Sequence, residues 1–140
     1  MLGMEKACDE IMDEINDYMG SVFENICRQY LIRQAREGKL PFVPYTLGKW
    51  WGNNPVLKAQ DDVDILAFDK KGERAIFVEC KFRNKPMPME EYEDLVTATK
   101  AFPDLKERYL IFISKSGFTE PVIRRAKEEG AQLLTLGDLL

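Results

Sequence analysis

Two acidic residues and a lysine lie where a pair of predicted strands would bring them together. Asp64 lies in VDILAFD, and Glu79 and Lys81 lie in AIFVECKF, with a turn-like Asp-Lys-Lys-Gly between these two apolar segments. Because side chains alternate faces along a strand, Glu79 and Lys81 would point the same way, roughly 7 Å apart. If the strands pair as a hairpin with Asp64 opposite an odd-numbered residue, Asp64 joins them on that face.

This set of side chains is suited to a divalent cation and a phosphate ester. Mg²⁺ prefers hard oxygen ligands and keeps several waters, so one or two carboxylates and substrate oxygens can hold it. A bound metal activates water and offsets charge on a phosphate, and a neighbouring lysine could hold or deprotonate that water. Two adjacent carboxylates repel each other unless a cation is present. The pattern therefore predicts a Mg²⁺ or Mn²⁺ site at Asp64 and Glu79, with Lys81 beside it.

The spacing of these residues resembles the signature of the PD-(D/E)XK nuclease superfamily. Four segments in order are similar to the nuclease-like domain at the C-terminus of archaeal DEXX-box ATPases: Ser21-Val22-Phe23-Glu24, Gly48-Lys49-Trp50-Trp51-Gly52, Asp62-Val63-Asp64-Ile65 and Glu79-Cys80-Lys81. Residues 111–119 are also similar to a strand-to-helix junction in Mrr-like relatives. The resemblance covers roughly residues 21–140, and the double tryptophan is its more specific element.

The resemblance implies a metal-dependent nuclease that hydrolyses phosphodiester bonds, above all in DNA. Asp64, Glu79 and Lys81 would be its catalytic residues, and the carbonyl of Cys80 would join the two carboxylates as a metal ligand. The fold implied is a restriction-endonuclease-like α/β core, with a mixed central β-sheet flanked by helices in the order α-β-β-β-α-β-α-β. The expected partners are DNA and an ATPase domain or subunit, and a homodimer is left open.

Two other functions stay open at this point. One is a non-catalytic accessory domain that binds nucleic acid or protein for an ATPase. GxxxxGK[ST] does not occur in the sequence, so ATP hydrolysis would belong to a partner or to residues outside this chain. The other is an RNA- or tRNA-acting relative, because nothing in the sequence distinguishes DNA from RNA. Acid-x-lysine pairs also arise by chance. The evidence for a metal site is therefore the position of this pair at the end of an apolar strand.

The amino-acid composition limits the class of protein and the kinds of catalysis that the chain can carry out. The 140 residues are 45% hydrophobic and 31% charged, which is typical of one globular domain, and no apolar run is long enough for a membrane span. A cytoplasmic location is therefore expected. The absence of histidine excludes histidine-dependent catalysis and leaves no set of zinc ligands. The three cysteines, Cys8, Cys27 and Cys80, lie in apolar stretches without CxxC spacing and are predicted to be buried free thiols.

Basic residues that follow the acidic motif are candidates for phosphate contact. The net charge of −4 argues against indiscriminate coating of nucleic acid, but a local basic face is compatible with it. Arg83 and Lys85 occur at alternate positions after Lys81, and Lys115 precedes the last long helix. These three residues are the predicted nucleic-acid contacts, and an ordinary solvated surface is the alternative.

The N-terminal region is expected to contain two helices. Apolar side chains recur at helical spacing over residues 4–19, Gly20 is predicted to end that helix, and Ser21 is predicted to begin another. Residues 1–20 would then be a connecting helix and residues 21–140 the nuclease-like domain. Glu24 has two interpretations: the capping-box partner of Ser21, or a further carboxylate of the metal site.

A first strand is predicted between Phe42 and Trp51. Trp50 and Trp51 would point to opposite faces of this strand, so that one packs in the core. The other could stack on a base or sugar, although covering the sheet is the commoner role for such a side chain.

Overall fold

The computed structural model describes residues 2–140, with the backbone alone for residue 2. The elements follow the predicted order α-β-β-β-α-β-α-β, and one short helix is added at the end. The helices are α1 (Leu2–Arg36), α2 (Met89–Thr99), α3 (Glu120–Glu129) and α4 (Leu136–Leu139). The strands are β1 (Thr46–Asn54), β2 (Ala59–Phe68), β3 (Arg74–Lys81), β4 (Glu107–Ser114) and β5 (Gln132–Thr135).

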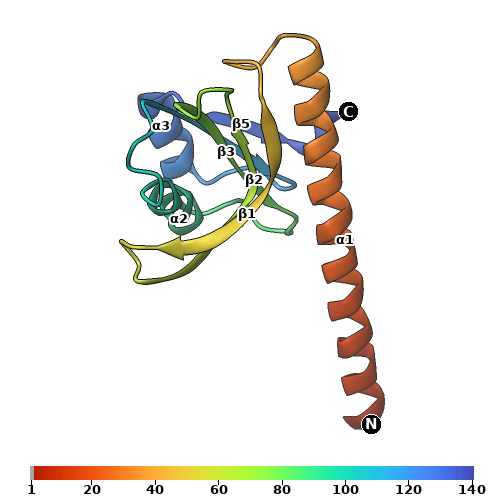
Figure 1. Cartoon of the computed structure of the whole chain (residues 1–140). Coiled ribbons are helices and arrows are strands. Elements are labelled where there is room, and N and C mark those ends of the chain that lie inside the picture. Colours follow the sequence, from red (N-terminus) through yellow and green to blue (C-terminus); the bar gives the residue numbers. More distant parts are fainter. Residues whose placement is uncertain (1) are drawn as a thin grey trace.

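The strands form one five-stranded sheet in chain order, from β1 to β5. β1, β2 and β3 are antiparallel neighbours, whereas β3, β4 and β5 run parallel. The parallel pairs need crossover connections, which α2 and α3 provide on one side of the sheet, while α1 lies on the other side (Figure 1). A mixed sheet flanked by helices is the fold class that the sequence predicted, and it is confirmed.

An apolar core on each face of the sheet holds these layers together. α1 places Phe23, Cys27 and Leu31 in the first core, and their four-residue spacing puts them on one side of the helix. In the second core, Tyr92 and Leu95 of α2 pack against the other face of the sheet. The first core includes Ile65 and Cys80, and the second includes Val63. Helices α1 and α2 are therefore packed on opposite faces of the sheet near the start of the β2–β3 ladder at Ile65 and the end of β3.

Helix α1 continues through Gly20, so the predicted break at this residue is wrong. Glycine lowers helix stability by about 1 kcal/mol relative to alanine but does not prevent helical dihedral angles. The buried face that begins at Phe23 stabilises the second half of α1 and favours a continuous helix. Ser21 is therefore an interior residue of α1, and it does not form the predicted capping box with Glu24.

The first half of α1 projects beyond the rest of the molecule (Figure 1). Residues 3–18 are all exposed. The exposed apolar side chains in this segment include Met4, Ile11, Met12, Ile15 and Tyr18. Cys8 is exposed as well, so the prediction of buried thiols is right for Cys27 and Cys80 and wrong for Cys8. Even with these side chains, no helix within residues 2–140 is long and apolar enough to cross a membrane.

Removal of residues 2–18 is expected to leave the fold intact. Because these side chains are exposed, their loss should shift the melting temperature by less than about 2 °C. Phe23→Ala is the contrasting substitution, since it empties a buried position of the same helix and should cost about 3–5 kcal/mol. Thermal unfolding followed by circular dichroism measures both. A large loss of stability in the shortened chain would show that the predicted domain boundary near residue 20 is wrong.

Candidate active site

Asp64 lies where the ladder between β2 and β3 ends. The paired residues run from Phe68 and Ala75 to Ile65 and Val78, so the next positions along the two strands are Asp64 and Glu79. On its other side, β2 pairs with β1, and this ladder contains an irregularity. Gly48 pairs with Leu66 and Trp50 pairs with Val63, so two residues of β2 lie opposite the single residue Lys49 of β1. A β-bulge of this kind redirects a side chain and is common beside active sites.

The carboxylate of Asp64 is held in place by the backbone of β3. Its Oδ2 accepts a hydrogen bond of 2.8 Å from the amide of Cys80. The residue is only 9% exposed, and a buried carboxylate is costly without compensating partners. One hydrogen bond leaves several lone pairs of this carboxylate available for a further partner.

Glu79 and Lys81 point to the same side of β3, as the strand periodicity predicted. The Nζ of Lys81 lies 3.1 Å from Oε1 of Glu79, and the side chains are 27% and 15% exposed, respectively. Burial raises the pKa of Glu79 to about 8, the charge of Asp64 adds to this effect, and the ammonium of Lys81 opposes it. Asp64, Glu79 and Lys81 are thus brought together in the structure.

The lysine is held in its charged form. Burial alone would lower the pKa of Lys81, but the carboxylates of Glu79 and Glu91 outweigh burial and raise it above its usual value. A lysine with a raised pKa stays protonated near neutral pH. Lys81 can therefore donate hydrogen bonds and positive charge in this site, and the base role is disfavoured.

Glu24, on α1, is close enough to Asp64 for the charges of the two carboxylates to interact. Burial raises the pKa of Glu24, and the charge of Asp64 raises it further, while Lys49 opposes the shift. These influences place the Glu24 carboxylate in the electrostatic environment of Asp64 on the α1 side of the sheet. Of its two predicted roles, capping is contradicted by the continuous helix, and a part in the site stays a prediction.

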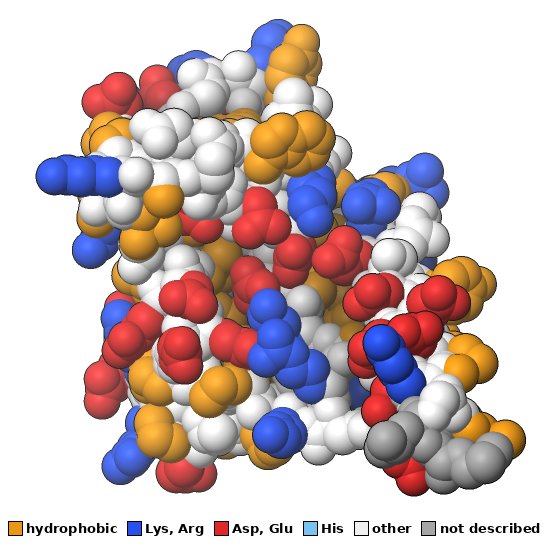
Figure 2. Space-filling view, turned by 90° about the horizontal axis from the view of Figure 1, so that it is seen from below, with side chains coloured by type: hydrophobic (Ala, Val, Ile, Leu, Met, Phe, Trp, Pro, Cys, Tyr) orange, Lys and Arg blue, Asp and Glu red, His pale blue; other side chains and the backbone are white. Residues whose placement is uncertain are grey.

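An acidic hollow of about 200 Å³ opens beside these residues. Its charged lining comprises Asp61 and Asp62 of β2, Glu79 and Lys81 of β3, and Asp94 of α2. Figure 2 shows the corresponding acidic character of one face, where Asp and Glu side chains gather around the hollowed middle with a few basic side chains among them. A phosphate ester entering this hollow would be repelled unless a cation offset the charge.

The residues fit a divalent cation that shares its ligands with solvent and substrate. Within residues 2–140, three or more Asp, Glu, Cys or His side chains do not gather into a metal site by themselves. Asp64 and Glu79 provide two adjacent carboxylates; burial raises the pKa of Glu79, and the negative charge of Asp64 adds to the rise. Mg²⁺ typically takes one or two carboxylates and fills its shell with water and phosphate oxygens. The carbonyl of Cys80 remains a predicted additional ligand.

The three predicted nucleic-acid contacts have different surroundings. Arg83 forms an ion pair with Glu91 of α2. Lys115 donates a hydrogen bond of 2.8 Å to Oδ1 of Asn84, and its Nζ lies 4.5 Å from the ring centroid of Phe82. Lys85 is exposed. Because internal partners reduce what Arg83 and Lys115 can offer to a phosphate, Lys85 is the freest of the three cations.

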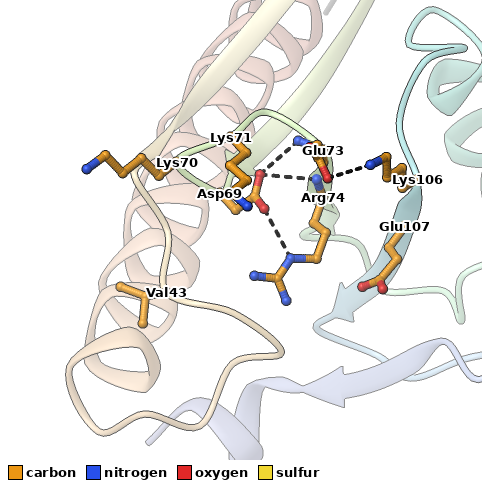
Figure 3. A pocket seen from close by; sticks show the side chains of 8 residues that line it. All are labelled: Val43, Asp69, Lys70, Lys71, Glu73, Arg74, Lys106 and Glu107. Carbon is orange, nitrogen blue, oxygen red and sulfur yellow. Dashed lines mark hydrogen bonds and ion pairs between the residues drawn. The ribbon is translucent and has the colours of Figure 1, made fainter.

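A larger hollow of about 490 Å³ lies at the opposite end of β3 (Figure 3). Its charged side chains largely neutralise one another: Asp69 pairs with Arg74 at 3.1 Å, and Lys106 pairs with Glu73 at 3.0 Å. Asp69 also accepts hydrogen bonds from the amides of Glu73 and Arg74, which fixes the β2–β3 turn. These contacts explain the hollow as part of a stable turn, and the size of a hollow does not by itself identify the reactive site.

Several residues of the acidic hollow were not singled out from the sequence. Asp61 belongs to β2 and Asp94 to α2, so the two residues come together only in the fold. Asn54, at the end of β1, is fully buried and donates hydrogen bonds to Asp61 Oδ2 and to the carbonyl of Thr97. The signal available in the sequence was the acidic pair before Val63, whose second member shares a strand face with Asp64.

Glu79→Gln is expected to stabilise the metal-free protein at alkaline pH. Because its pKa is raised from 4.5 to about 8 on folding, Glu79 binds a proton more tightly in the folded state. The stability from this proton is fully present below about pH 4.5 and is lost as pH rises to about pH 8. Each pKa unit corresponds to about 1.4 kcal/mol, so the loss over the whole shift is on the order of 5 kcal/mol.

Urea unfolding in EDTA at about pH 5 and about pH 9 measures this effect. The parent should lose stability between the two conditions, and the glutamine variant should lose much less. A variant that is less stable than the parent at both pH values would show instead that Glu79 acts as a structural ion-pair partner of Lys81.

The comparisons with known proteins agree with this geometry at the level of family and fold. Residues 2–97 match the model of the family DUF234, described as "Archaea bacterial proteins of unknown function", and the chain belongs to this family. It is 30% identical over 110 residues to an uncharacterized protein, MJECL04, of Methanocaldococcus jannaschii. That match covers 76% of this chain and 24% of the relative, so the chain spans about a quarter of the relative's length.

Two solved structures share the fold at low sequence identity. One is a protein of unknown function, AF1548, with a TM-score of 0.52 and 16% identity over 79% of this chain and 62% of that chain. The other is a repair endonuclease from Pyrococcus abyssi, with a TM-score of 0.50 and 14% identity over 81% of this chain and 46% of that chain. The fold of this chain is therefore similar to that of an endonuclease.

Proposed function

We propose that this protein is a Mg²⁺- or Mn²⁺-dependent nuclease of the PD-(D/E)XK type that hydrolyses phosphodiester bonds in DNA. The observation that carries the proposal is the largely buried pair of Asp64 and Glu79, with the ammonium of Lys81 at 3.1 Å from Glu79. Three charged residues converge at one edge of an otherwise apolar sheet, where each is costly unless it has a use. The endonuclease-like fold supports the same reaction class.

The acidic side chains and the lysine have different roles: the carboxylates hold a cation, and the lysine donates hydrogen bonds and positive charge. Asp64 and Glu79 hold the cation, which when bound offsets charge on the phosphate. Asp64 is kept in position by the amide of Cys80, so one of its oxygens is fixed before substrate arrives. Lys81, protonated because of Glu79 and Glu91, donates hydrogen bonds to water or to a phosphate oxygen beside the carboxylates. The chain thus supplies position and charge for an attack by water, with Lys81 as donor.

A cleavage assay tests this proposal directly. Supercoiled plasmid, single strands and branched DNA are incubated with the protein in Mg²⁺, Mn²⁺ or EDTA. Cutting in the metals and none in EDTA is the expected result. The variant with Asp64→Asn and Lys81→Ala, purified in the same way, controls for contaminating nuclease. Equal cutting by this variant, or no cutting of any substrate, would reject the proposal.

One observation favours a second function, that of a binding domain without catalysis. The hollow is lined by several carboxylates, and Arg83 and Lys115 already have partners within the chain. Such a face attracts cations and basic surfaces more readily than DNA. A protein that binds no divalent metal and cuts nothing would favour this accessory-domain function, with an ATPase domain or subunit as its proposed partner.

A further inference from the structure

The two adjacent tryptophans of β1 have opposite environments. Trp50 packs against Phe102 with ring centroids 4.9 Å apart and belongs to the core on the α2 side of the sheet. Trp51 points the other way and is 69% exposed. Since Trp50 already covers the sheet, the core does not account for the large exposed ring of Trp51.

Trp51 lies one strand away from the candidate active site. Its paired residue on β2 is Asp62, which lines the acidic hollow together with Glu79 and Lys81. Neighbouring strands are about 4.8 Å apart, and directly paired residues have their side chains on the same face. The indole therefore lies on the α1 side of the sheet beside Asp62, which borders the hollow, while Glu79 and Lys81 face the α2 side; a group that extends past Asp62 from a substrate bound in the hollow would meet the ring.

The strand that carries Trp51 is firmly supported. The buried side chain of Asn54 ties the end of β1 to Thr97 of α2 with a hydrogen bond of 3.0 Å, and to Asp61 of β2 with one of 3.1 Å. At Gly52, an added Cβ atom would approach the ring of Trp50 to 2.9 Å, so only glycine allows this close packing. An aromatic ring on a rigid support loses little conformational freedom when a ligand stacks on it.

A lysine and the apolar end of the β1–β2 hairpin lie near the ring of Trp51. Lys49 is two residues before Trp51, on the same face of β1, and its Nζ is 4.0 Å from Asp62 Oδ2. The β1–β2 hairpin extends away from the sheet (Figure 1), and Val56 and Leu57 are exposed at its end. Leu57 also lines the hollow. An aromatic face with a neighbouring lysine suits a nucleotide, because the base stacks on the ring and the phosphate meets the ammonium.

We propose that Trp51 stacks on an unpaired nucleobase next to the hollow, so that the protein prefers single-stranded segments or strand ends over continuous duplex. Within a duplex both faces of each base are covered by its neighbours, so the indole finds a free face only where stacking is interrupted. This inference rests on the proposed function for the choice of nucleic acid as ligand. It adds the substrate class and a residue outside the metal site that selects it.

The test uses the fluorescence of the two tryptophans in the Lys81→Ala background, so that binding is measured without cleavage. A single-stranded oligonucleotide and a blunt duplex of the same sequence are titrated in Mg²⁺ and in EDTA. The single strand should quench the fluorescence of Trp51, while Trp50 in the core stays protected. Trp51→Ala should weaken single-strand binding by about 5- to 150-fold, as expected for one base stacked on an aromatic ring.

Matched variants distinguish base stacking from a purely electrostatic contact and from self-association through the exposed ring. Trp51→Phe keeps an aromatic face and should retain most of the affinity, and duplex binding should change less than about twofold in either variant. Unchanged single-strand affinity in Trp51→Ala, equal losses for both nucleic acids, or an altered oligomeric state by light scattering would each overturn the inference. In those cases cleavage by the parent protein would still support the nuclease. A parent that neither binds nor cuts would reject both proposals.

Discussion

Lys81→Ala is expected to lower the rate of DNA cleavage by about a hundredfold to ten-thousandfold while leaving metal affinity almost unchanged. The ammonium lies 3.1 Å from Glu79 and is kept protonated by Glu79 and Glu91. A group that donates charge to the reacting phosphate contributes mainly in the transition state, so its loss reduces turnover more than binding. Single-turnover cleavage at saturating protein measures this effect, and titration calorimetry with Mn²⁺ measures the metal affinity.

Lys85→Ala is the matched control for the loss of one lysine near the site. Lys85 is exposed and lies beyond the end of β3, so its loss should weaken DNA binding slightly and leave the saturated rate unchanged. The salt dependence of binding should fall by about one unit, as for one lost phosphate contact. Arg83→Ala should have a smaller effect than a free arginine would, because Glu91 already pairs with it. Equal cleavage rates for Lys81→Ala and the parent would remove Lys81 from the mechanism.

The position of Glu79 and Lys81 could be predicted because it depends on a short-range rule. Side chains two residues apart on a strand share a face, whatever surrounds the strand. The hairpin of β2 and β3 could be predicted as well, because a tight turn of Asp69, two lysines and Gly72 links two apolar segments. Gly72 has a φ of 69°, the left-handed conformation that glycine allows at such a turn.

The bulge that orients Asp64 could not be predicted, because it is a property of the ladder between β1 and β2. Nothing in the sequence around Asp64 indicates that β2 has an extra residue opposite Lys49. The amide of Cys80, sixteen positions away along the chain, becomes its hydrogen-bond donor only once β3 is in place. The acidic wall contributed by Asp94 likewise depends on how α2 packs across the sheet.

At Gly20, tertiary packing outweighs the local signals for a helix boundary. A glycine followed by Ser-x-x-Glu is a common pattern at a helix boundary. In this chain, packing of Phe23, Cys27 and Leu31 on the sheet stabilises a helix that also extends through Gly20. The continuous helix leaves Glu24 without a capping role, and its carboxylate interacts electrostatically with Asp64.

Asp64→Asn is expected to abolish the binding of divalent metal, with the loss of cleavage as its consequence. Asparagine has nearly the same shape, and its side-chain oxygen can still accept the hydrogen bond from the amide of Cys80, so the fold should persist. The substitution removes one of the two charges that attract the cation, and hard divalent ions depend on anionic oxygen ligands. In the parent, metal should also raise the melting temperature, because it binds the folded state only.

Asp62→Asn is the matched control for this substitution. Asp62 lies two residues before Asp64 and lines the same hollow, but it is exposed, and its nearest cation is Lys49. Titration calorimetry with Mn²⁺ should show near-normal binding in this variant and none in Asp64→Asn. Glu24→Gln should fall between the two if its carboxylate belongs to the outer part of the site. Undiminished binding in Asp64→Asn would place the cation elsewhere in the hollow, beside Asp61 and Asp94, and the proposed catalytic role of Asp64 would then be rejected.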